Sequence, residues 1–147
     1  MADNSEQHFR FLENMYHRAP TNDYFKPVLE IVKSEATLTI PVREDFFHAG
    51  GAVHGAVYFK ALDDAAFFAA NSLVRDVFVL TVSFSIQLIR PVVAGQMVAK
   101  GRVTQPGRTQ IFAQSDLYDA RGRLVAQGQG NFSRSKTLLT PEIGYCD

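Results

Sequence analysis

A glycine-rich segment, residues 48–56, leads directly into a stretch with helical periodicity. The first amides of a helix have no partner within the helix, and the positive end of the helix dipole lies behind them. Gly55 has no Cβ, so a substrate carbonyl can approach its N–H closely. This arrangement predicts a backbone oxyanion site at Gly55, which would stabilise the negative charge that develops on a carbonyl under attack.

Two adjacent acids, Asp63 and Asp64, lie within the expected helix but on different faces. Asp64 follows Lys60 by four residues and shares a stripe with Asn71, which predicts a solvated ion pair. The helical neighbours of Asp63 are apolar: Phe59, Ala66, Phe67 and Ala70. Partial burial raises the pKa of a carboxyl group and suits it to act as a general base or nucleophile. The spacing equally allows Asp63 to satisfy a buried backbone or hydroxyl group.

Two histidines flank the glycines of this segment. His54 directly precedes Gly55, and its position favours a capping or packing role that shapes the loop. His48 could donate a hydrogen bond to a substrate carbonyl, or it could be a solvated loop residue. Both readings of His48 stay open on its position alone.

Length and composition indicate one domain, residues 1–147, without covalent staples. Basic and acidic residues are equal at 15 each, so the chain lacks the positive field that nucleic acid or an anionic membrane surface requires. Cys146 is the single cysteine, which excludes an internal disulfide and a cysteine-based zinc site. The polar N-terminus and the absence of a long apolar run predict a cytoplasmic protein.

The order of predicted elements indicates an α+β fold in which an antiparallel sheet wraps around one long central helix. The sequence predicts helices at 5–17 and 53–72, a β-like stretch at 28–42, and four strands at 81–90, 96–104, 109–118 and 123–133. Short turns suggest that these four strands form a meander. Small residues in the last strand, Gly128 and Gly130, are expected to let the helix approach the sheet closely.

Residues 48–70 resemble the signature of hotdog-fold acyl-CoA thioesterases of the phenylacetate-pathway type. That signature has a polar residue, usually Asn, then Gly, then His-Gly-Gly, then an Asp nine residues after the His. The matching positions here are His48, Gly51, His54-Gly55-Ala56 and Asp63. Further similarity is carried by Ile89-Arg90-Pro91-Val92, Gly95, Gly107-Arg108 and residues 119–126. The likeness extends from about residue 28 to residue 133.

The resemblance implies a role for each matching residue. Asp63 would activate the hydrolytic water or attack the thioester itself, and Thr81 would help to orient that water. The Gly55 N–H would polarise the thioester carbonyl, with His54 beside it and His48 in the place of the usual Asn. An imidazole can still donate one hydrogen bond, but its charge changes with pH, unlike that of an amide.

The family pattern also implies where substrate and subunits meet. The substrate-binding residues would be Ala56 and Phe59 beside the acyl group, and Arg90 and Arg108 at the phosphates of coenzyme A. Ala56 replaces the second Gly of the signature and narrows the space there. The Asp and the oxyanion loop come from different subunits in this family, so a homodimer or homotetramer with interfacial active sites is expected.

The expected activity is hydrolysis of a medium-chain or aromatic acyl-CoA to the free acid and CoA. The aromatic residues Tyr58, Phe59, Phe67 and Phe68 suggest an apolar acyl site. No metal or organic cofactor is implied, since coenzyme A is part of the substrate. Two alternatives are a hotdog dehydratase of hydroxyacyl thioesters and a non-catalytic acyl-CoA-binding protein. The His48 substitution keeps the second alternative open.

Overall fold

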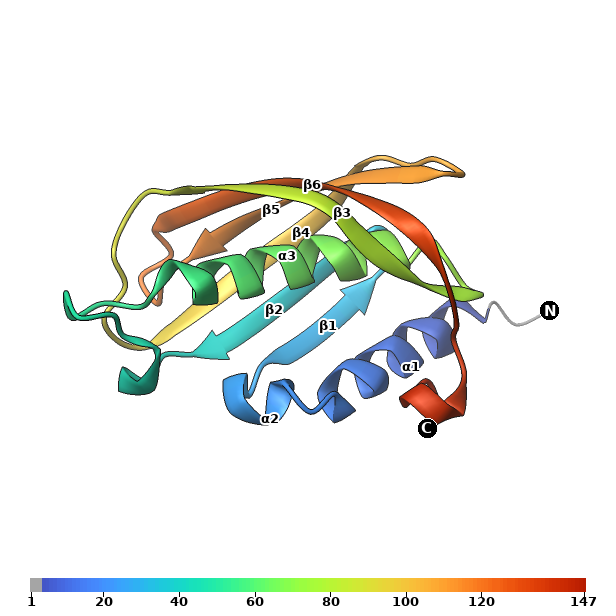
Figure 1. Cartoon of the computed structure of the whole chain (residues 1–147), viewed down its shortest axis with the longest axis horizontal. Coiled ribbons are helices and arrows are strands. Elements are labelled where there is room, and N and C mark those ends of the chain that lie inside the picture. The colour runs from blue at the N-terminus through green and yellow to red at the C-terminus, as the bar shows by residue number, and fades with distance from the viewer. Residues whose placement is uncertain (1–3) are drawn as a thin grey trace.

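The computed structural model describes residues 4–147 and contains one six-stranded sheet. Its strands are β1 (Val28–Val32), β2 (Glu35–Pro41), β3 (Val77–Leu88), β4 (Gln96–Gln105), β5 (Gln110–Tyr118) and β6 (Leu124–Leu138). Neighbouring strands are antiparallel and follow the order β1-β2-β4-β5-β6-β3. The sheet curves around helix α3 (Gly55–Asn71), as Figure 1 shows, which confirms the predicted fold class.

The other helices cover the margin of the sheet and its connections. They are α1 (Ser5–Arg18), α2 (Asn22–Phe25) and the short 3-10 helices η1 (Glu44–Phe46) and η2 (Pro141–Ile143). Helix α1 packs beside β1 and near the C-terminal segment (Figure 1). The predicted helices at 5–17 and 53–72 are therefore confirmed. Helix α2 lies between the predicted elements and was not anticipated.

The stretch 28–42 is a hairpin of two strands, not one strand. Val32 pairs with Glu35, so residues 33 and 34 form the turn, and Ser34 adopts a positive φ of 67°. The Ser72 hydroxyl accepts a hydrogen bond from the Ser34 N–H at 2.8 Å. The turn is therefore stabilised by a residue that directly follows α3, far along the chain. Its own residues include neither Gly nor Asn, the residues that usually mark a two-residue hairpin turn in a sequence.

The predicted four-strand meander is wrong in the position of β3. Strands β4, β5 and β6 do form a meander, but β3 pairs with β6 and β2 pairs with β4. The segment 89–95 is thus a crossover from the edge strand β3 past β6 and β5 to the interior strand β4 (Figure 1). Strand β3 consequently lies at an edge of the sheet, and one side of it has no neighbouring strand within residues 4–147.

Among the glycines of the sheet, Gly101 of β4 is the one that lies against the backbone of α3, and the glycines of the last strand do not, contrary to the prediction. A Cβ at Gly101 would overlap the backbone of Ala65 in α3. Gly128 and Gly130 instead accommodate the ring of Phe84, which lies across both positions from the neighbouring strand. The glycines of β6 therefore serve packing within the sheet.

We expect Gly101→Ala to destabilise the fold by about 1–3 kcal/mol or more, because the added methyl group forces α3 away from β4. Urea unfolding monitored by circular dichroism measures the change. The control is Arg102→Ala, one position along on the outer face, where the effect should stay within about 0.5 kcal/mol. Equal stability of both variants would contradict the proposed close contact.

The end of α3 is joined to β3 by a buried asparagine. Asn71 is fully buried, and its Nδ2 donates to the carbonyl oxygens of Val74 and Val77 at 3.1 and 3.2 Å. Its Oδ1 accepts from the Val79 N–H at 3.0 Å. These bonds fix the start of β3 relative to α3, and thereby the two elements that carry Asp63 and Thr81.

Within residues 4–147, no helix is both long and apolar enough to cross a membrane.

Candidate active site

Asp63 lies on the side of α3 that faces β3. The Thr81 hydroxyl donates a hydrogen bond to Asp63 Oδ1 at 3.0 Å, so the two residues predicted to act together are in contact. Burial raises the pKa of Asp63 from 3.8 to about 6, and the negative charge of Asp64 adds to this rise. The Thr81 hydrogen bond and the Lys60 ammonium oppose it. The carboxyl group is thus poised to exchange a proton near neutral pH.

Asp64 does not form the solvated ion pair that its spacing predicted. Lys60 Nζ does lie 2.7 Å from Asp64 Oδ2, but the two side chains are only 15% and 17% exposed. The Tyr16 hydroxyl, from α1, donates to the same oxygen at 2.6 Å. Tyr16 is 48 residues from Asp64 along the chain, and no pattern within α3 indicated that another helix covers Asp64.

Gly55 is the first residue of α3 and follows the N-cap His54. The Ala56 N–H donates to His54 Nδ1 at 2.9 Å, and the Val57 N–H donates to the His54 carbonyl. In the part of the chain that the structure describes, the Gly55 N–H is thus the first-turn amide that keeps no partner. The predicted capping role of His54 is met by this geometry, and it leaves the Gly55 amide available to a ligand.

His48 lies in the same surface depression as Gly55. This depression has a volume of about 330 Å³ and is also lined by Tyr58 and Arg90. His48 Nδ1 accepts a hydrogen bond from the Gly50 N–H at 2.9 Å, which leaves Nε2 as the nitrogen that can donate to a ligand. The Tyr58 hydroxyl donates to the Arg90 carbonyl oxygen at 2.8 Å and joins α3 to the crossover segment.

Within one chain, Asp63 and Gly55 are too far apart to act on the same carbonyl group. They are eight residues apart on α3, which corresponds to about 12 Å along the helix axis. Asp63 lines a different and larger cleft of about 850 Å³. The chain therefore presents the acid and the oxyanion amide at separate places on its surface.

The two predicted phosphate-binding arginines also lie far apart. The Arg90 N–H donates to the carbonyl of Val125 near the start of β6. Arg108 lies in the β4–β5 turn, two residues before Gln110, which pairs with Ser133. Val125 and Ser133 are eight residues apart on β6, or about 26 Å. One chain cannot bring both arginines to the same small group of phosphates.

The predicted acyl-site residues divide between several environments. Phe67 and Phe68 line the cleft beside Asp63. Phe59 is 40% exposed and packs edge-on against Phe84, at a centroid distance of 5.7 Å, outside that cleft. The backbone N–H of Ala56 is already hydrogen-bonded to the His54 side chain.

Among residues 4–147, no three His, Cys, Asp or Glu side chains gather closely enough to hold a metal ion.

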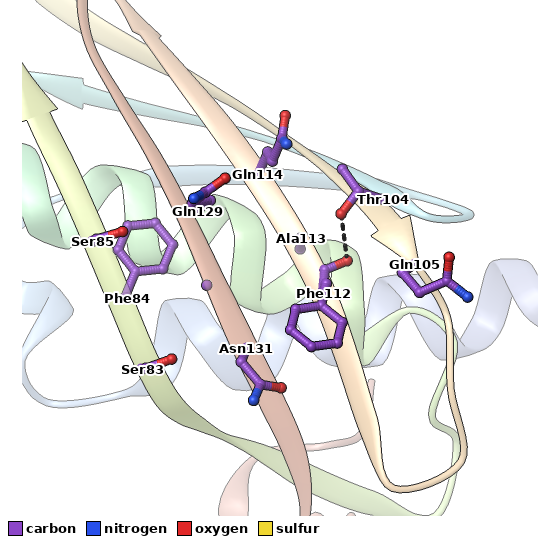
Figure 2. Close-up of a pocket in the computed structure, with 11 residues that line it drawn as sticks. Ser83, Phe84, Ser85, Thr104, Gln105, Phe112, Ala113, Gln114, Gln129 and Asn131 are labelled. Carbon is purple, nitrogen blue, oxygen red and sulfur yellow. Dashed lines mark hydrogen bonds between the residues drawn. The ribbon is translucent and has the colours of Figure 1, made fainter.

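A further cavity of about 510 Å³ lies on the outer face of the sheet, over β3 to β6. Figure 2 shows its lining of hydroxyl and amide side chains, among them Ser83, Gln114, Gln129 and Asn131. None of its lining residues is an Asp, Glu, His, Cys, Lys or Arg. Without a general base or a charged group, this cavity lacks the chemistry of the α3 side of the sheet.

Comparison with known proteins places this site within a family. Residues 50–126, more than half of the chain, match the model of the Thioesterase superfamily, and the chain belongs to this family. The match contains Gly55, Asp63 and Thr81. The solved structures it resembles share the same hotdog fold of sheet and central helix.

Individual proteins and solved structures are similar to this chain. A protein of Saccharolobus solfataricus named a "putative esterase" is 28% identical over 112 residues, which cover 76% of this chain and 80% of that protein. The E. coli PaaI protein, from the phenylacetic acid degradation operon, superposes with a TM-score of 0.84 at 19% identity, over 94% of this chain and 100% of PaaI. AziG from S. sahachiroi is 27% identical, with a TM-score of 0.73 over 79% of this chain and 96% of AziG.

Proposed function

We propose that this protein hydrolyses the thioester bond of a medium-chain or aromatic acyl-CoA and releases the free acid and CoA. The observation that carries the proposal is Asp63, a half-buried carboxylate with a raised pKa, bound to Thr81 at the rim of a large cleft. A carboxylate of this kind suits a base or nucleophile, and the family is one of thioesterases.

The catalytic unit in this proposal is a homodimer formed along β3. This edge strand exposes apolar side chains to solvent: Leu80, Val82 and Leu88 are 50%, 57% and 55% exposed. A long edge strand with exposed apolar residues is a template for pairing with another chain. Pairing of β3 with β3 of a second copy about a two-fold axis would cover both edges at once.

The same pairing would bring an acid to an oxyanion site. Asp63 is hydrogen-bonded to Thr81 of β3. Gly55 lies against Leu88 of the same strand, because a Cβ added to Gly55 would be 3.1 Å from Leu88 Cδ1. An antiparallel pair of β3 strands with its axis between Phe84 and Ser85 sets Thr81 opposite the partner's Leu88. Asp63 then faces the partner's Gly55 across the interface.

Association of dimers into a tetramer and residence in the cytoplasm stay predictions.

The proposed chemistry uses groups from both subunits. The ionised Asp63 either takes a proton from water, which attacks the thioester carbonyl, or attacks that carbon itself. The partner's Gly55 N–H stabilises the oxyanion, and the partner's His48 Nε2 can donate a second hydrogen bond. The C–S bond then breaks and CoA leaves as its thiolate, which takes up a proton. In the route through water, this step gives the free acid directly. In the nucleophilic route it leaves a mixed anhydride of Asp63 and the acyl group, which a water molecule then hydrolyses to the free acid and the regenerated Asp63. Both routes begin with Asp63 ionised.

Release of free thiol from a series of acyl-CoAs tests the proposal. The panel runs from acetyl-CoA to dodecanoyl-CoA and includes phenylacetyl-CoA, because PaaI belongs to a phenylacetic acid operon. We expect stoichiometric thiol and acid, with a preference for the longer or aromatic acyl groups. Hydration of an enoyl-CoA without thiol release would identify a dehydratase instead, and binding without turnover would identify an acyl-CoA-binding protein.

The activity should fall as the pH drops through about 6, because protonation of Asp63 removes the base or nucleophile. Thr81→Val removes a hydrogen bond that stabilises the ionised form, so the acid limb of kcat/KM should move to higher pH. Thr81→Ser keeps the donor and should keep the native profile. A pH–rate profile that is the same for Thr81→Val and the native protein would contradict the role of this bond.

A further inference from the structure

We infer that the acyl group lies in the 850 Å³ cleft beside Asp63, and that helix α1 and the C-terminal segment 141–146 limit the length of the acyl group that fits. This inference rests on the proposed function and extends it. The cleft is within the size range of small-molecule sites in proteins. Because Asp63 lies at its margin, a thioester carbonyl placed at Asp63 can direct its acyl group into the cleft.

The walls of the cleft are mainly apolar and come from segments far apart in the chain. Helix α3, strand β3, helix α1 and the C-terminal segment 141–146 supply, among others, Phe67, Phe68, Leu80, Met15 and Ile143. Phe67 also packs against Phe78 of β3, at a centroid distance of 5.0 Å, which closes the wall between helix and sheet. An acyl chain that enters the cleft therefore exchanges water for hydrocarbon and aromatic contacts.

The C-terminal segment is a fixed part of this wall because several bonds tie it to α1. Arg18 donates to the carbonyl oxygens of Gly144 and Asp147 at 3.0 and 2.6 Å. Asn14 donates to the carbonyl oxygen of Cys146 at 2.8 Å. A Cβ on Gly144 would lie 3.3 Å from Met15 Cα, so the backbone of the segment packs directly on the helix.

The charges around the cleft favour a neutral acyl group. The basic residues that line it are Lys60 and Arg18. Lys60 is paired with Asp64 at 2.7 Å, and Arg18 is occupied by the carbonyls of the C-terminal segment. A carboxylate on the acyl group would find no unpaired cation on this lining, so a hydrocarbon or aromatic chain fits best.

Helix α1 and the C-terminal segment both lie outside residues 50–126, the part that matches the family model. The residues proposed for hydrolysis thus lie within the matched part, whereas part of the cleft wall comes from outside it. A change in the C-terminal segment should alter which acyl groups are accepted without altering the groups that break the thioester bond.

Ile143→Trp tests this inference, because Ile143 lines the cleft and is 38% exposed, so the larger ring can fill space without disturbing the core. We expect kcat/KM for decanoyl-CoA to fall at least about tenfold, while that for acetyl-CoA stays within about twofold. The control is Val32→Trp, an exposed apolar residue on β1 outside this lining, which should keep the native profile. Ile143→Phe provides the same test if the Trp variant does not fold.

Direct binding separates this inference from the proposed function. The thioethers S-decyl-CoA and S-ethyl-CoA cannot be hydrolysed, and titration calorimetry gives their affinities for each variant. A loss of affinity for the decyl ligand alone in Ile143→Trp supports the cleft, even if the native protein releases no thiol and the proposed function fails. Unchanged length dependence in both turnover and binding would overturn the inference and leave hydrolysis intact.

Discussion

Replacement of Asp63 by Asn is expected to lower kcat for thiol release by about 10²–10⁴-fold, because the amide can neither accept a proton from water nor attack the carbonyl. Asn matches Asp in shape and can keep the Thr81 hydrogen bond, so the loss reports chemistry and not packing. The measurement is the steady-state rate of thiol release from the best acyl-CoA of the panel, at pH 8, where the native carboxyl is ionised.

Asp64→Asn is the matched control for this result. It removes a neighbouring acid that is bound to Tyr16 and Lys60 but does not face Thr81. Activity should persist, and its acid limb should move to lower pH, because the charge of Asp64 raises the pKa of Asp63. Equal activity of the native protein and both variants would exclude Asp63 from the mechanism.

Asp63→Asn should also stabilise the fold at high pH, since the native protein holds a carboxylate where burial disfavours charge. The folded pKa of about 6 exceeds the ordinary 3.8, so ionisation of Asp63 destabilises the folded state. This cost is absent below pH 3.8, grows between 3.8 and 6, and is complete above 6. At full size it is about 2–3 kcal/mol. Urea unfolding should show the variant more stable than the native protein at pH 8 and equal to it near pH 3.5; equal stability at both would contradict the raised pKa.

Gly55→Pro has the second large expected effect, a loss of about 10²–10³-fold in kcat. Proline removes the backbone N–H assigned to the oxyanion and leaves His48 Nε2 as the remaining donor. The helix itself should tolerate the change, because Gly55 is the first residue of α3, a position that suits proline. His54 is already extended, with φ −64° and ψ 142°, as a residue before proline requires.

Gly55→Ala distinguishes the loss of the amide from the presence of a side chain. Alanine keeps the N–H and adds a Cβ whose nearest neighbour is the flexible end of Leu88 at 3.1 Å. It should therefore retain much more activity than Gly55→Pro in the same thiol-release assay. Similar losses in the two variants would mean that space at Gly55 matters and that its N–H does not.

The parts of the site that the sequence predicted best are those that depend on local geometry. The helical face of Asp63 follows from the spacing of residues within one helix, and in the structure Asp63 contacts Thr81 of β3. The helix was predicted to begin at about residue 53 and begins at Gly55. The pairing of Thr81 with Asp63 came from family resemblance, because no local pattern links a strand residue to a helix residue eighteen positions earlier.

Features set by distant elements were not predictable from the same patterns. The burial of Asp64 depends on Tyr16 of α1, and the turn at Ser34 depends on Ser72 after α3. The position of β3 at the edge of the sheet depends on a crossover whose Pro and Gly resemble those of a simple turn. Each of these follows from tertiary packing, which overrides the local signal.

Mixing two inactive variants gives the most direct test of the central claim, that Asp63 of one subunit acts with Gly55 of the other. Asp63→Asn and Gly55→Pro are unfolded together in urea, refolded as an equal mixture, and assayed for thiol release. Half of the dimers then contain both variants, and each of these has one intact site, so activity should recover to about one quarter of the native value. Activity that stays at the mean of the two separate variants, in mixtures shown to contain mixed dimers, would contradict the shared site.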